Sequence, residues 1–320
     1  MKVLVTGGAG FIGSYLVDSL LTDDTQVTVV DNFESDYPAE VKRRNIAAHL
    51  NHPGYALVPF DLRAPEPLIK QVPRTVDVVV HLAGKAGVLP SLADPISTYA
   101  ANVNGTIAVL EYARAAGVPK VVFASSSSVY GESPYPPWDE DDILSPVSPY
   151  GASKLAGEQL LRLYSRLYGI QAIALRYFTA YGPRQRPDLA IHKFARCLRD
   201  GRPVTLYGDG SSRRDYTYID DIVAGTRQAM AYQAAGFHAF NLGSGAPVTL
   251  LQMAKQVATA MRRQAVVEHH PVQAGDPPVT WARIDKARRD LGYQPSLSFA
   301  DGVTRFVDWY VAEEGRRHDL

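Results

Sequence analysis

The opening of the chain constrains its fold more than any other segment. The apolar run at 2–5 leads directly into Thr6-Gly7-Gly8-Ala9-Gly10-Phe11-Ile12-Gly13, and an apolar-periodic segment follows at once. This order predicts a buried strand, a tight turn and a helix. Glycines at 7, 10 and 13 permit the turn, close approach of a ligand to the backbone, and close helix packing. Because unpaired amides at a helix N-terminus attract a pyrophosphate, the segment predicts a dinucleotide site.

Short β-branched runs alternate with helical patterns through the first 178 residues. This alternation predicts an α/β fold with a doubly wound, mostly parallel sheet and helices on both faces, a Rossmann fold. Strands are expected at 2–6, 26–31, 56–59, 76–81, 120–125 and 172–177. Long helices are expected at 96–116 and 150–168, each followed by a glycine stop signal. We assign residues 1–178 to a dinucleotide-binding domain, rejoined by parts of 214–245.

The pattern becomes less regular after residue 178. A basic loop at 181–188 precedes an expected helix near 189–200 and a short strand at 204–207. A further strand is expected at 214–219, with Asp220 or Asp221 capping the next helix. Ligands of open α/β sheets bind at the carboxyl ends of the strands. Residues 179–320 are therefore expected to form mainly a smaller C-terminal α/β lobe that binds the substrate.

The bulk composition excludes several classes of partner. Lys+Arg and Asp+Glu both total 33, so no global field draws the chain to nucleic acid or to an anionic membrane. No apolar run approaches the roughly 20 residues that span a bilayer. The single cysteine, Cys197, excludes an internal disulfide and a cysteine-cluster metal site, and we expect no metal. The expected compartment is the cytoplasm.

The predicted second strand ends in Asp31, which is suited to an adenosine ribose. An acid about 20 residues past the glycine turn accepts hydrogen bonds from the ribose diol and repels a 2′-phosphate. Asn32 is not a basic clamp, so NAD is favoured over NADP. Lys42-Arg43-Arg44 is interpreted as a solvated helix face. The alternative is a structural turn with a solvated aspartate. Further cofactor contacts are expected at strand ends, from Asp61, Leu62, Leu82, Ala83 and Gly84, whereas His81 is interpreted as a structural histidine.

Tyr150 and Lys154 share one face of the predicted helix at 150–168. A phenol has a pKa of about 10, and an ammonium about 4 Å away contributes about 4 kcal/mol towards ionising it. The serine run 125–128 ends the fifth predicted strand, and one hydroxyl there can help to relay a proton. With the cofactor turn, these residues predict redox chemistry at a hydroxyl carbon. The alternative is an exposed pair beside a polar strand end.

Motifs along almost the whole chain are similar to those of one family. They are Thr6–Gly13, Asp31-Asn32, His81–Gly84, Asn102-Val103-Asn104-Gly105-Thr106, Ser125–Gly131, Tyr150–Lys154, Arg176-Tyr177-Phe178, Gly208-Asp209-Gly210 and Arg214-Asp215-Tyr216. In this order they resemble the extended short-chain dehydrogenase/reductase family, specifically its nucleotide-sugar 4-epimerases.

The resemblance implies NAD-dependent inversion of C4 in a UDP-sugar through a transient 4-keto intermediate. It implies that Tyr150, Lys154 and Ser126 are catalytic. It also implies a homodimer formed through the helices at 96–116 and 150–168. The cofactor contacts that it implies in addition to those above are Phe11, Ile12, Asn32, Lys85, Asn102, Tyr150, Lys154 and Tyr177.

For the sugar, Thr179, the loop at 182–188 and Gln273-Ala274-Gly275-Asp276 resemble UDP-glucuronate 4-epimerases. Hydroxyls of Ser127, Ser128 and Thr179 would then hold a C6 carboxylate. Arg214 matches a diphosphate-binding arginine, Arg184 or Arg186 could also reach the substrate, and Asp276 would contact the uridine ribose.

Leu89 departs from the glucuronate pattern, which usually has arginine there. UDP-glucose/UDP-galactose therefore stays open as the substrate pair. A 4,6-dehydratase is a further alternative, although Ser127 and Ser128 occupy the positions of its acidic pair. The last alternative is a non-catalytic NAD(H)-sensing protein, which would not need the serine, tyrosine and lysine.

Overall fold

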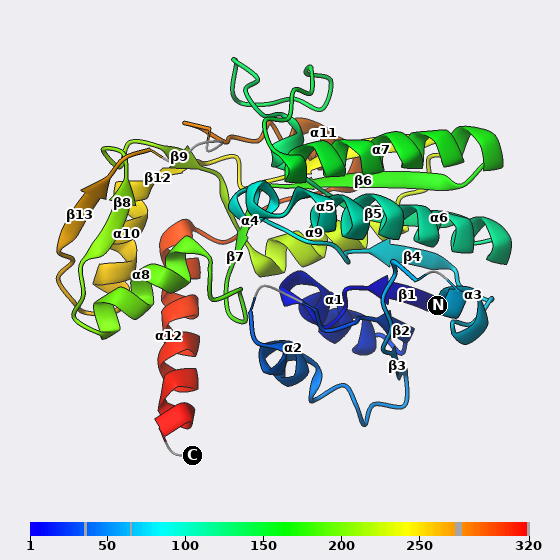
Figure 1. The fold of residues 1–320 in the computed structure, drawn as a ribbon, viewed down its shortest axis with the longest axis horizontal. Coiled ribbons are helices and arrows are strands. Elements are labelled where there is room, and N and C mark those ends of the chain that lie inside the picture. Colours follow the sequence, from blue (N-terminus) through cyan, green and yellow to red (C-terminus); the bar gives the residue numbers. More distant parts are fainter. Residues whose placement is uncertain (35–36, 65, 273–276, 319–320) are drawn as a thin grey trace.

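A seven-stranded, wholly parallel sheet forms the centre of the molecule (Figure 1). The computed structural model describes residues 1–34, 37–64, 66–272 and 277–318. The strand order is β11-β6-β5-β4-β1-β2-β3. The strands are β1 (Lys2–Thr6), β2 (Gln26–Val30), β3 (Tyr55–Val58), β4 (Val78–His81), β5 (Lys120–Ser126), β6 (Gln171–Tyr177) and β11 (Phe237–Leu242). The predicted doubly wound sheet is confirmed, and the second half of the chain supplies its edge strand β11.

Helices cover both faces of this sheet because its strands carry apolar side chains on both sides. In β1, Val3 and Val5 join one buried cluster while Leu4 joins the other. The first cluster includes Leu16 of α1 and the second includes Leu110 of α6. One face is covered by α1 (Phe11–Leu21) and α9 (Ile219–Ala231), and the other by α3 (Glu66–Gln71), α6 (Gly105–Ala116) and α7 (Pro149–Tyr168). A second-row helix, α2 (Ala39–Ile46), lies beside α1.

The long helix expected at 96–116 is present as one unbroken helical run from Pro95 to Ala116, with a π-helical turn inside it that the sequence did not predict. The structure has α4 (Val88–Ala93), α5 (Pro95–Tyr99), a π-helical turn (Ala100–Asn104) and then α6. Asn102, in the π turn, is buried and its amide bonds to the Lys85 backbone and to Ser153. The π turn thus coincides with hydrogen bonds from Asn102 to other parts of the fold. π turns inside α-helices often lie near functional sites.

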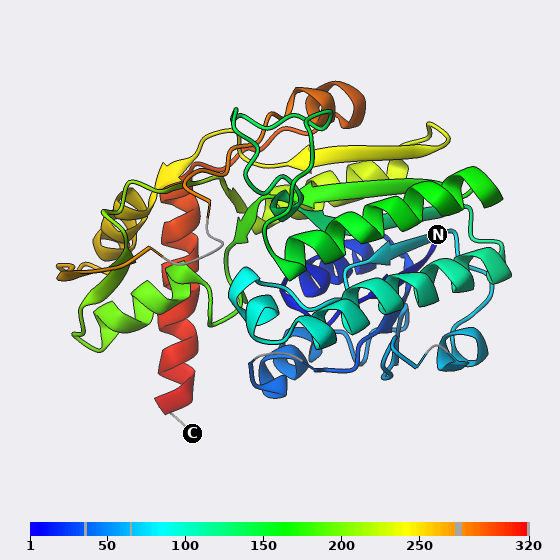
Figure 2. The ribbon, with the colours of Figure 1, turned by 45° about the horizontal axis from the view of Figure 1, so that its top comes forward.

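The C-terminal part of the chain builds a smaller α/β lobe beside the carboxyl ends of the central strands (Figure 1 and Figure 2). Three two-stranded sheets pair β7 with β10, β8 with β13, and β9 with β12. Their bounds are β7 (Thr179–Tyr181), β8 (Val204–Tyr207), β9 (Arg213–Arg214), β10 (Tyr216–Tyr218), β12 (Val248–Thr249) and β13 (Val267–His270). The helices here are α8 (Ala190–Arg199), α10 (Leu250–Ala260) and α12 (Phe299–His318), while α11 (Asp285–Leu291) packs near β11.

The segment expected as one strand at 214–219 is interrupted at Asp215. The buried Asp215 carboxylate accepts hydrogen bonds from the backbone amides of Ser244, Gly245 and Ala282, which separates β9 from β10. The expected cap was also wrong: α9 begins at Ile219, and Asp221 lies in its first turn and accepts hydrogen bonds from Ser296. No helix in the described ranges is both long and apolar enough to cross a bilayer.

Candidate active site

The glycine turn leaves open space at the N-terminus of α1. Gly7 has φ +74°, and a Cβ there would lie 2.7 Å from the Ala83 backbone nitrogen. A Cβ on Gly13 would lie 2.2 Å from the Gly7 carbonyl oxygen, so only glycine lets the helix pack against the turn. Gly10 is the N-cap of α1 and lines a cavity of about 240 Å³. The positive end of the helix dipole therefore faces this cavity, as an anionic pyrophosphate requires.

Most of the expected cofactor residues line this first cavity together. They are Gly7, Gly10, Phe11, Ile12, Gly13, Asp31, Asn32, Asp61, Leu62, Leu82, Ala83, Gly84 and Lys85. They come from the turns that follow β1 to β4, which end at one edge of the sheet. Because carboxyl ends of parallel strands meet there, segments far apart in the sequence form one wall.

Asp31 lies at the end of β2 and bonds to the glycine turn. Its Oδ2 accepts a hydrogen bond from the Ala9 amide at 3.1 Å, and its Oδ1 accepts one from the Phe33 amide at 2.8 Å. Lys42 Nζ also lies 3.1 Å from Oδ1, and its side chain is only 11% exposed. The interpretation of Lys42 as part of a solvated helix face was therefore wrong, since Lys42 lines the cavity.

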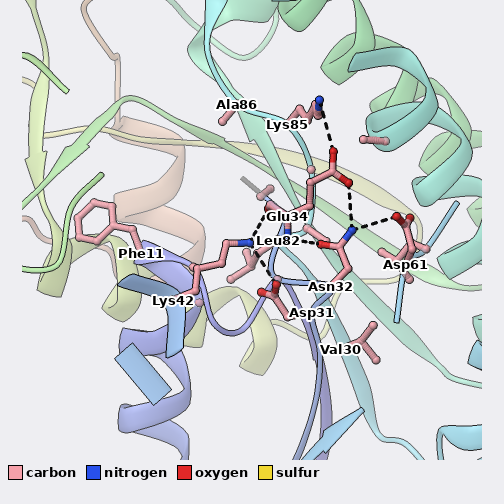
Figure 3. A pocket seen from close by; sticks show the side chains of 18 of the residues that line it. Phe11, Val30, Asp31, Asn32, Glu34, Lys42, Asp61, Leu82, Lys85 and Ala86 are labelled. Carbon is pink, nitrogen blue, oxygen red and sulfur yellow. Dashed lines mark hydrogen bonds and ion pairs between the residues drawn. The ribbon is translucent and has the colours of Figure 1, made fainter. Parts of the chain in front are cut away.

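A charged cluster surrounds the end of the cavity near β2 and β3 (Figure 3). Asn32 Nδ2 donates to Asp61 Oδ2 at 3.0 Å, and Lys85 Nζ lies 3.5 Å from Glu34 Oε1. Arg63 bonds to both Asp61 and Glu34, and it lowers the pKa of Asp61 to about 2. Sequence reasoning missed Glu34 and Arg63, because the pairing spans loops 29 residues apart.

Asn102 holds the backbone of Gly84 and Lys85, which forms part of the cavity wall. Its Oδ1 accepts a hydrogen bond from the Lys85 amide at 2.7 Å, and its Nδ2 donates to the Lys85 carbonyl at 3.0 Å and to Ser153 Oγ at 2.8 Å. A Cβ on Gly84 would lie 2.7 Å from Asn102 Oδ1. Asn102 thus positions the 84–85 backbone, which itself lines the cavity.

Tyr150, Lys154 and Ser126 lie beside the same cavity. Ser148 caps α7 by accepting a hydrogen bond from the Gly151 amide, which starts the helix just before Tyr150. Lys154 Nζ lies 5.9 Å from the centre of the Tyr150 ring and donates to the Ala124 carbonyl at 2.8 Å. The Ser126 hydroxyl lies close enough to the Tyr150 phenol to lower the pKa of the phenol. Because Ala124 lines the cavity, this hydrogen bond from Lys154 places Lys154 next to the cavity wall.

The electrostatics of the tyrosine differ from the expectation. Burial raises the pKa of the Tyr150 phenol, opposed by the hydrogen bond to Ser126 and by the charge of Arg186. Burial also lowers the pKa of Lys154 to about 8. The groups of the protein therefore leave the pKa of the Tyr150 phenol above its ordinary value. Lys154 was expected to lower this pKa towards neutral pH. A positively charged group bound in the adjoining cavity would lower the pKa of the Tyr150 phenol.

A buried ion pair lies next to Ser125, which precedes Ser126, and was missed from the sequence. Glu158 accepts hydrogen bonds from Arg176 Nε at 3.0 Å and Nη2 at 2.9 Å, and both side chains are 3% exposed. Ser125 Oγ donates to Glu158 at 2.5 Å. Glu158 follows Lys154 by four residues on α7, so helical spacing was the available signal. Ser125 is thereby engaged by Glu158, whereas Ser126 is the serine that lowers the pKa of Tyr150.

The two candidate arginines of the basic loop have different environments. Arg184 Nη1 lies 2.6 Å from Asp18 Oδ2 on α1, and its guanidinium stacks 4.6 Å from the centre of the Tyr15 ring. Arg186 lines the cofactor cavity, donates to the Ala86 carbonyl at 3.0 Å and pairs with Asp188. The structure therefore brings Arg186 to the site and holds Arg184 against α1.

A second cavity of about 420 Å³ lies in the C-terminal lobe. Thr179 and Arg214, both expected to bind substrate, line it. So does Asp188, the partner of Arg186, which places their ion pair between the two cavities. Further basic side chains line it that sequence reasoning missed, namely Lys193, Arg196 and Arg202. This concentration of positive charge suits a diphosphate.

The remaining expected residues have other positions. Ser127 and Ser128 form a short 3₁₀ turn directly after β5, where the Ser128 amide donates to Ser126 Oγ. Tyr177 lies in the core, with its hydroxyl 2.8 Å from Thr226 Oγ1 on α9. Asp276 lies outside the described residues. His81 is buried between Thr6 and Thr106, and burial lowers its pKa to about 3, as a neutral structural histidine requires.

Comparison with known proteins identifies the family. The family model for the NAD dependent epimerase/dehydratase family matches residues 3–243. The chain belongs to this family. A UDP-glucuronate 4-epimerase of Thermodesulfobacterium geofontis is 36% identical, over 96% of this chain and 95% of the relative. The resemblance inferred from the motifs is confirmed, and so is NAD as the cofactor of the family.

Solved structures of family members superpose closely. UDP-glucuronic acid 4-epimerase from Bacillus cereus, in complex with UDP-glucuronic acid and NAD, has a TM-score of 0.92 and 34% identity, covering 98% of this chain and 100% of that one. UDP-glucose 4-epimerase from Thermotoga maritima, with UDP-glucose, has a TM-score of 0.90 and 32% identity, covering 98% and 100%. This chain is thus similar to epimerases that bind different UDP-sugars.

The first cavity fits the cofactor of this family. Its glycine backbone at the start of α1 suits the pyrophosphate, and Asp31 suits the adenosine ribose. Ala124 and Gly84 bring its opposite wall to Lys154: Ala124 accepts the Lys154 hydrogen bond, and a Cβ on Gly84 would lie 3.5 Å from Nζ. NAD bound with its ribose at Asp31 would therefore extend towards Lys154 and Tyr150.

Proposed function

We propose that this protein is an NAD-dependent UDP-sugar 4-epimerase whose main substrates are UDP-glucuronate and UDP-galacturonate. The arrangement of Tyr150, Ser126 and Lys154 beside the cofactor cavity is the observation that carries the proposal. The NAD dependence of the family and the UDP-glucuronate 4-epimerases among its relatives support it.

Tyr150, Ser126 and Lys154 would each have a separate role in the reaction. The Tyr150 phenol takes the proton of the substrate C4 hydroxyl, and Ser126, which lies near the phenol, would hydrogen-bond that substrate oxygen. The Lys154 ammonium, together with a positive charge in the adjoining cavity, would stabilise the phenolate. The glycine turn and Asp31 would hold NAD, whose chemistry would be to take up hydride from C4 and to give it back to the opposite face of the sugar. Tyr150 then returns the proton, so the cycle consumes no cofactor.

The second cavity provides room and charge for the nucleotide part of the substrate. Arg214, Lys193 and Arg196 line it and would balance the diphosphate. Thr179 lines the same cavity, and Ser127 and Ser128 begin directly after Ser126. Their hydroxyls would hold a C6 carboxylate by hydrogen bonds. Arg186, whose charge acts on Tyr150, would lie at the sugar end of this path.

We also propose a cytoplasmic homodimer. Exposed apolar side chains gather on α5, α6 and α7, where a soluble monomer would normally carry polar groups. They are Ile96, Tyr99, Ile107, Leu163, Leu167 and Tyr168. A second copy burying these helices would remove that surface from water.

The decisive experiment is an assay of purified protein against UDP-glucuronate, UDP-galacturonate, UDP-glucose and UDP-galactose, without added cofactor. Anomeric-proton NMR should show many turnovers and the C4 epimer, fastest with the uronates. Faster conversion of the neutral hexoses would favour the UDP-glucose/UDP-galactose alternative. Loss of water, detected by mass spectrometry, would instead identify a 4,6-dehydratase. Retained NAD with every sugar unchanged would support a non-catalytic sensor and refute the proposal.

A further inference from the structure

Lys42 and Asp31 form a buried ion pair inside the cofactor cavity. Lys42 projects from α2 and Asp31 from the end of β2, and their side chains are 11% and 2% exposed. Figure 3 shows the ammonium group lying between the Asp31 carboxylate and the Glu34 backbone. Nζ lies 3.1 Å from Asp31 Oδ1 and donates to the Glu34 carbonyl at 2.9 Å. Both residues line the cavity.

The Lys42–Asp31 pair can form more hydrogen bonds than these contacts use. An ammonium has three donors, and two point to Asp31 and Glu34. A carboxylate accepts about four hydrogen bonds, and Asp31 accepts from Ala9, Phe33 and Lys42. Among the contacts of the described residues, one donor of Lys42 and one acceptor of Asp31 remain unused. This combination matches two adjacent hydroxyls, each of which can donate or accept.

The pair also changes how the site discriminates between cofactors. An unpaired carboxylate repels a ribose 2′-phosphate, but here a cation lies in contact with it. Arg43, the next residue, lies 4.8 Å from the centre of the Phe33 ring and adds positive charge nearby. Removing the negative charge of Asp31 would therefore leave the positive charges of Lys42 and Arg43 at the place where the 2′-phosphate would bind.

We propose that Lys42 is a second ribose-binding residue, and that the Lys42–Asp31 pair rather than Asp31 alone sets the preference for NAD over NADP. The inference rests on the proposed function in taking NAD as the cofactor. It adds a residue whose role was missed from the sequence. A purely structural pair tying α2 to β2 would stabilise the fold without altering the ratio of NAD to NADP affinity.

The first test measures binding to protein from which the cofactor has been removed, with no sugar present. Lys42→Met should weaken NAD⁺ binding by about ten- to a hundredfold, the range for a charge-assisted hydrogen bond, while Lys42→Arg should retain most of the affinity. Arg44→Met is the matched control, because Arg44 lies on the same helix, is half exposed and pairs with Glu313. Unchanged NAD⁺ binding by Lys42→Met, measured by calorimetry, would overturn the ribose contact.

The second test measures NADP⁺ binding. Asp31→Asn should raise NADP⁺ affinity relative to NAD⁺ by about tenfold or more, since Lys42 then faces the 2′-phosphate unpaired. Adding Lys42→Met should abolish the gain, whereas adding Arg44→Met should preserve it. An equal gain in the Asp31→Asn/Lys42→Met double variant would overturn the proposal. Asp31→Ser replaces Asp31→Asn if the latter fails to show a cooperative melting transition.

These measurements separate the two proposals. Binding of NAD⁺ and NADP⁺ requires no sugar turnover, so a protein inactive towards every UDP-sugar can still give the expected affinities. That combination would refute the epimerase and leave the role of Lys42 standing. Normal epimerisation with NAD⁺ affinity insensitive to Lys42→Met would do the reverse.

Discussion

The ammonium nitrogen of Lys154 lies 5.9 Å from the centre of the Tyr150 ring, and a hydrogen bond to the Ala124 carbonyl holds it there. Helical spacing of four residues brings the two side chains to one face of α7. The hydrogen bond to β5 then directs the lysine to the cofactor side. This geometry places Tyr150 and Lys154 together beside the first cavity, as the proposed mechanism requires.

Replacing Tyr150 with phenylalanine should remove turnover and spare cofactor binding. The change deletes the hydroxyl that exchanges the proton, while the glycine turn and Asp31 stay intact. We expect turnover to fall by about a thousandfold or more, within the range for loss of a positioned acid–base group. NMR turnover assays and calorimetric NAD⁺ titration measure the two effects. A variant retaining the wild-type rate would remove Tyr150 from the mechanism.

Lys154 should leave a signature in the pH dependence of stability. Burial lowers its folded pKa to about 8 from 10.5, so the unfolded chain binds more protons between these values. The destabilising contribution of this group is thus fully present below pH 8 and is lost as the pH rises towards 10.5. The shift corresponds to about 3 kcal/mol.

The measurement compares urea unfolding of cofactor-free wild type and Lys154→Met at pH 7.5 and pH 10. Other groups titrate in both proteins and cancel in the difference. Wild type should gain stability relative to the variant as the pH rises. A difference that does not change with pH would contradict a buried ammonium with a lowered pKa.

Glu158→Gln should destabilise the protein strongly. The substitution leaves the Arg176 guanidinium buried without its carboxylate, which typically costs about 3–5 kcal/mol. Ser125→Ala removes a single hydrogen bond to the same carboxylate and should cost about 1 kcal/mol. The double variant Glu158→Leu/Arg176→Met, which removes both charges, should be more stable than Glu158→Gln. Denaturant unfolding distinguishes these cases, and equal stability of Glu158→Gln and wild type would contradict the prediction.

Leu89→Arg should move substrate preference towards UDP-glucuronate. Leu89 lies on α4 and is 48% exposed, so arginine can replace it without entering the core. The added charge would favour a substrate carboxylate. The readout is the ratio of kcat/KM for UDP-glucuronate and UDP-glucose, which should rise about tenfold. An unchanged ratio would show that position 89 has no part in sugar selection.

Leu163→Glu should weaken the proposed homodimer. Leu163 is 48% exposed on α7, and a buried charge at a subunit interface is costly. Ile143→Glu is the matched control, because Ile143 is 86% exposed in the loop before α7. Sedimentation velocity should show monomers for the first variant and dimers for wild type and the control. Identical behaviour of both variants would argue against an interface at these helices.

The sequence by itself determined the features that depend on neighbouring residues. Alternating apolar strands and periodic helices predicted the parallel sheet, because side-chain direction repeats over two residues in a strand and 3.6 in a helix. The glycine turn predicted the open N-terminus of α1, and four-residue spacing predicted the shared face of Tyr150 and Lys154. Each of these depends on backbone geometry over less than about two helical turns.

The tertiary structure decided which polar side chains meet. Arg184 and Arg186 are two residues apart, yet one pairs with Asp18, 166 residues away, and the other enters the cofactor cavity. Lys42 was indistinguishable in sequence from its basic neighbours until packing of α2 brought it to Asp31. An ion pair forms only where the fold brings two charges within a few ångströms and removes them from water, and local sequence contains neither condition.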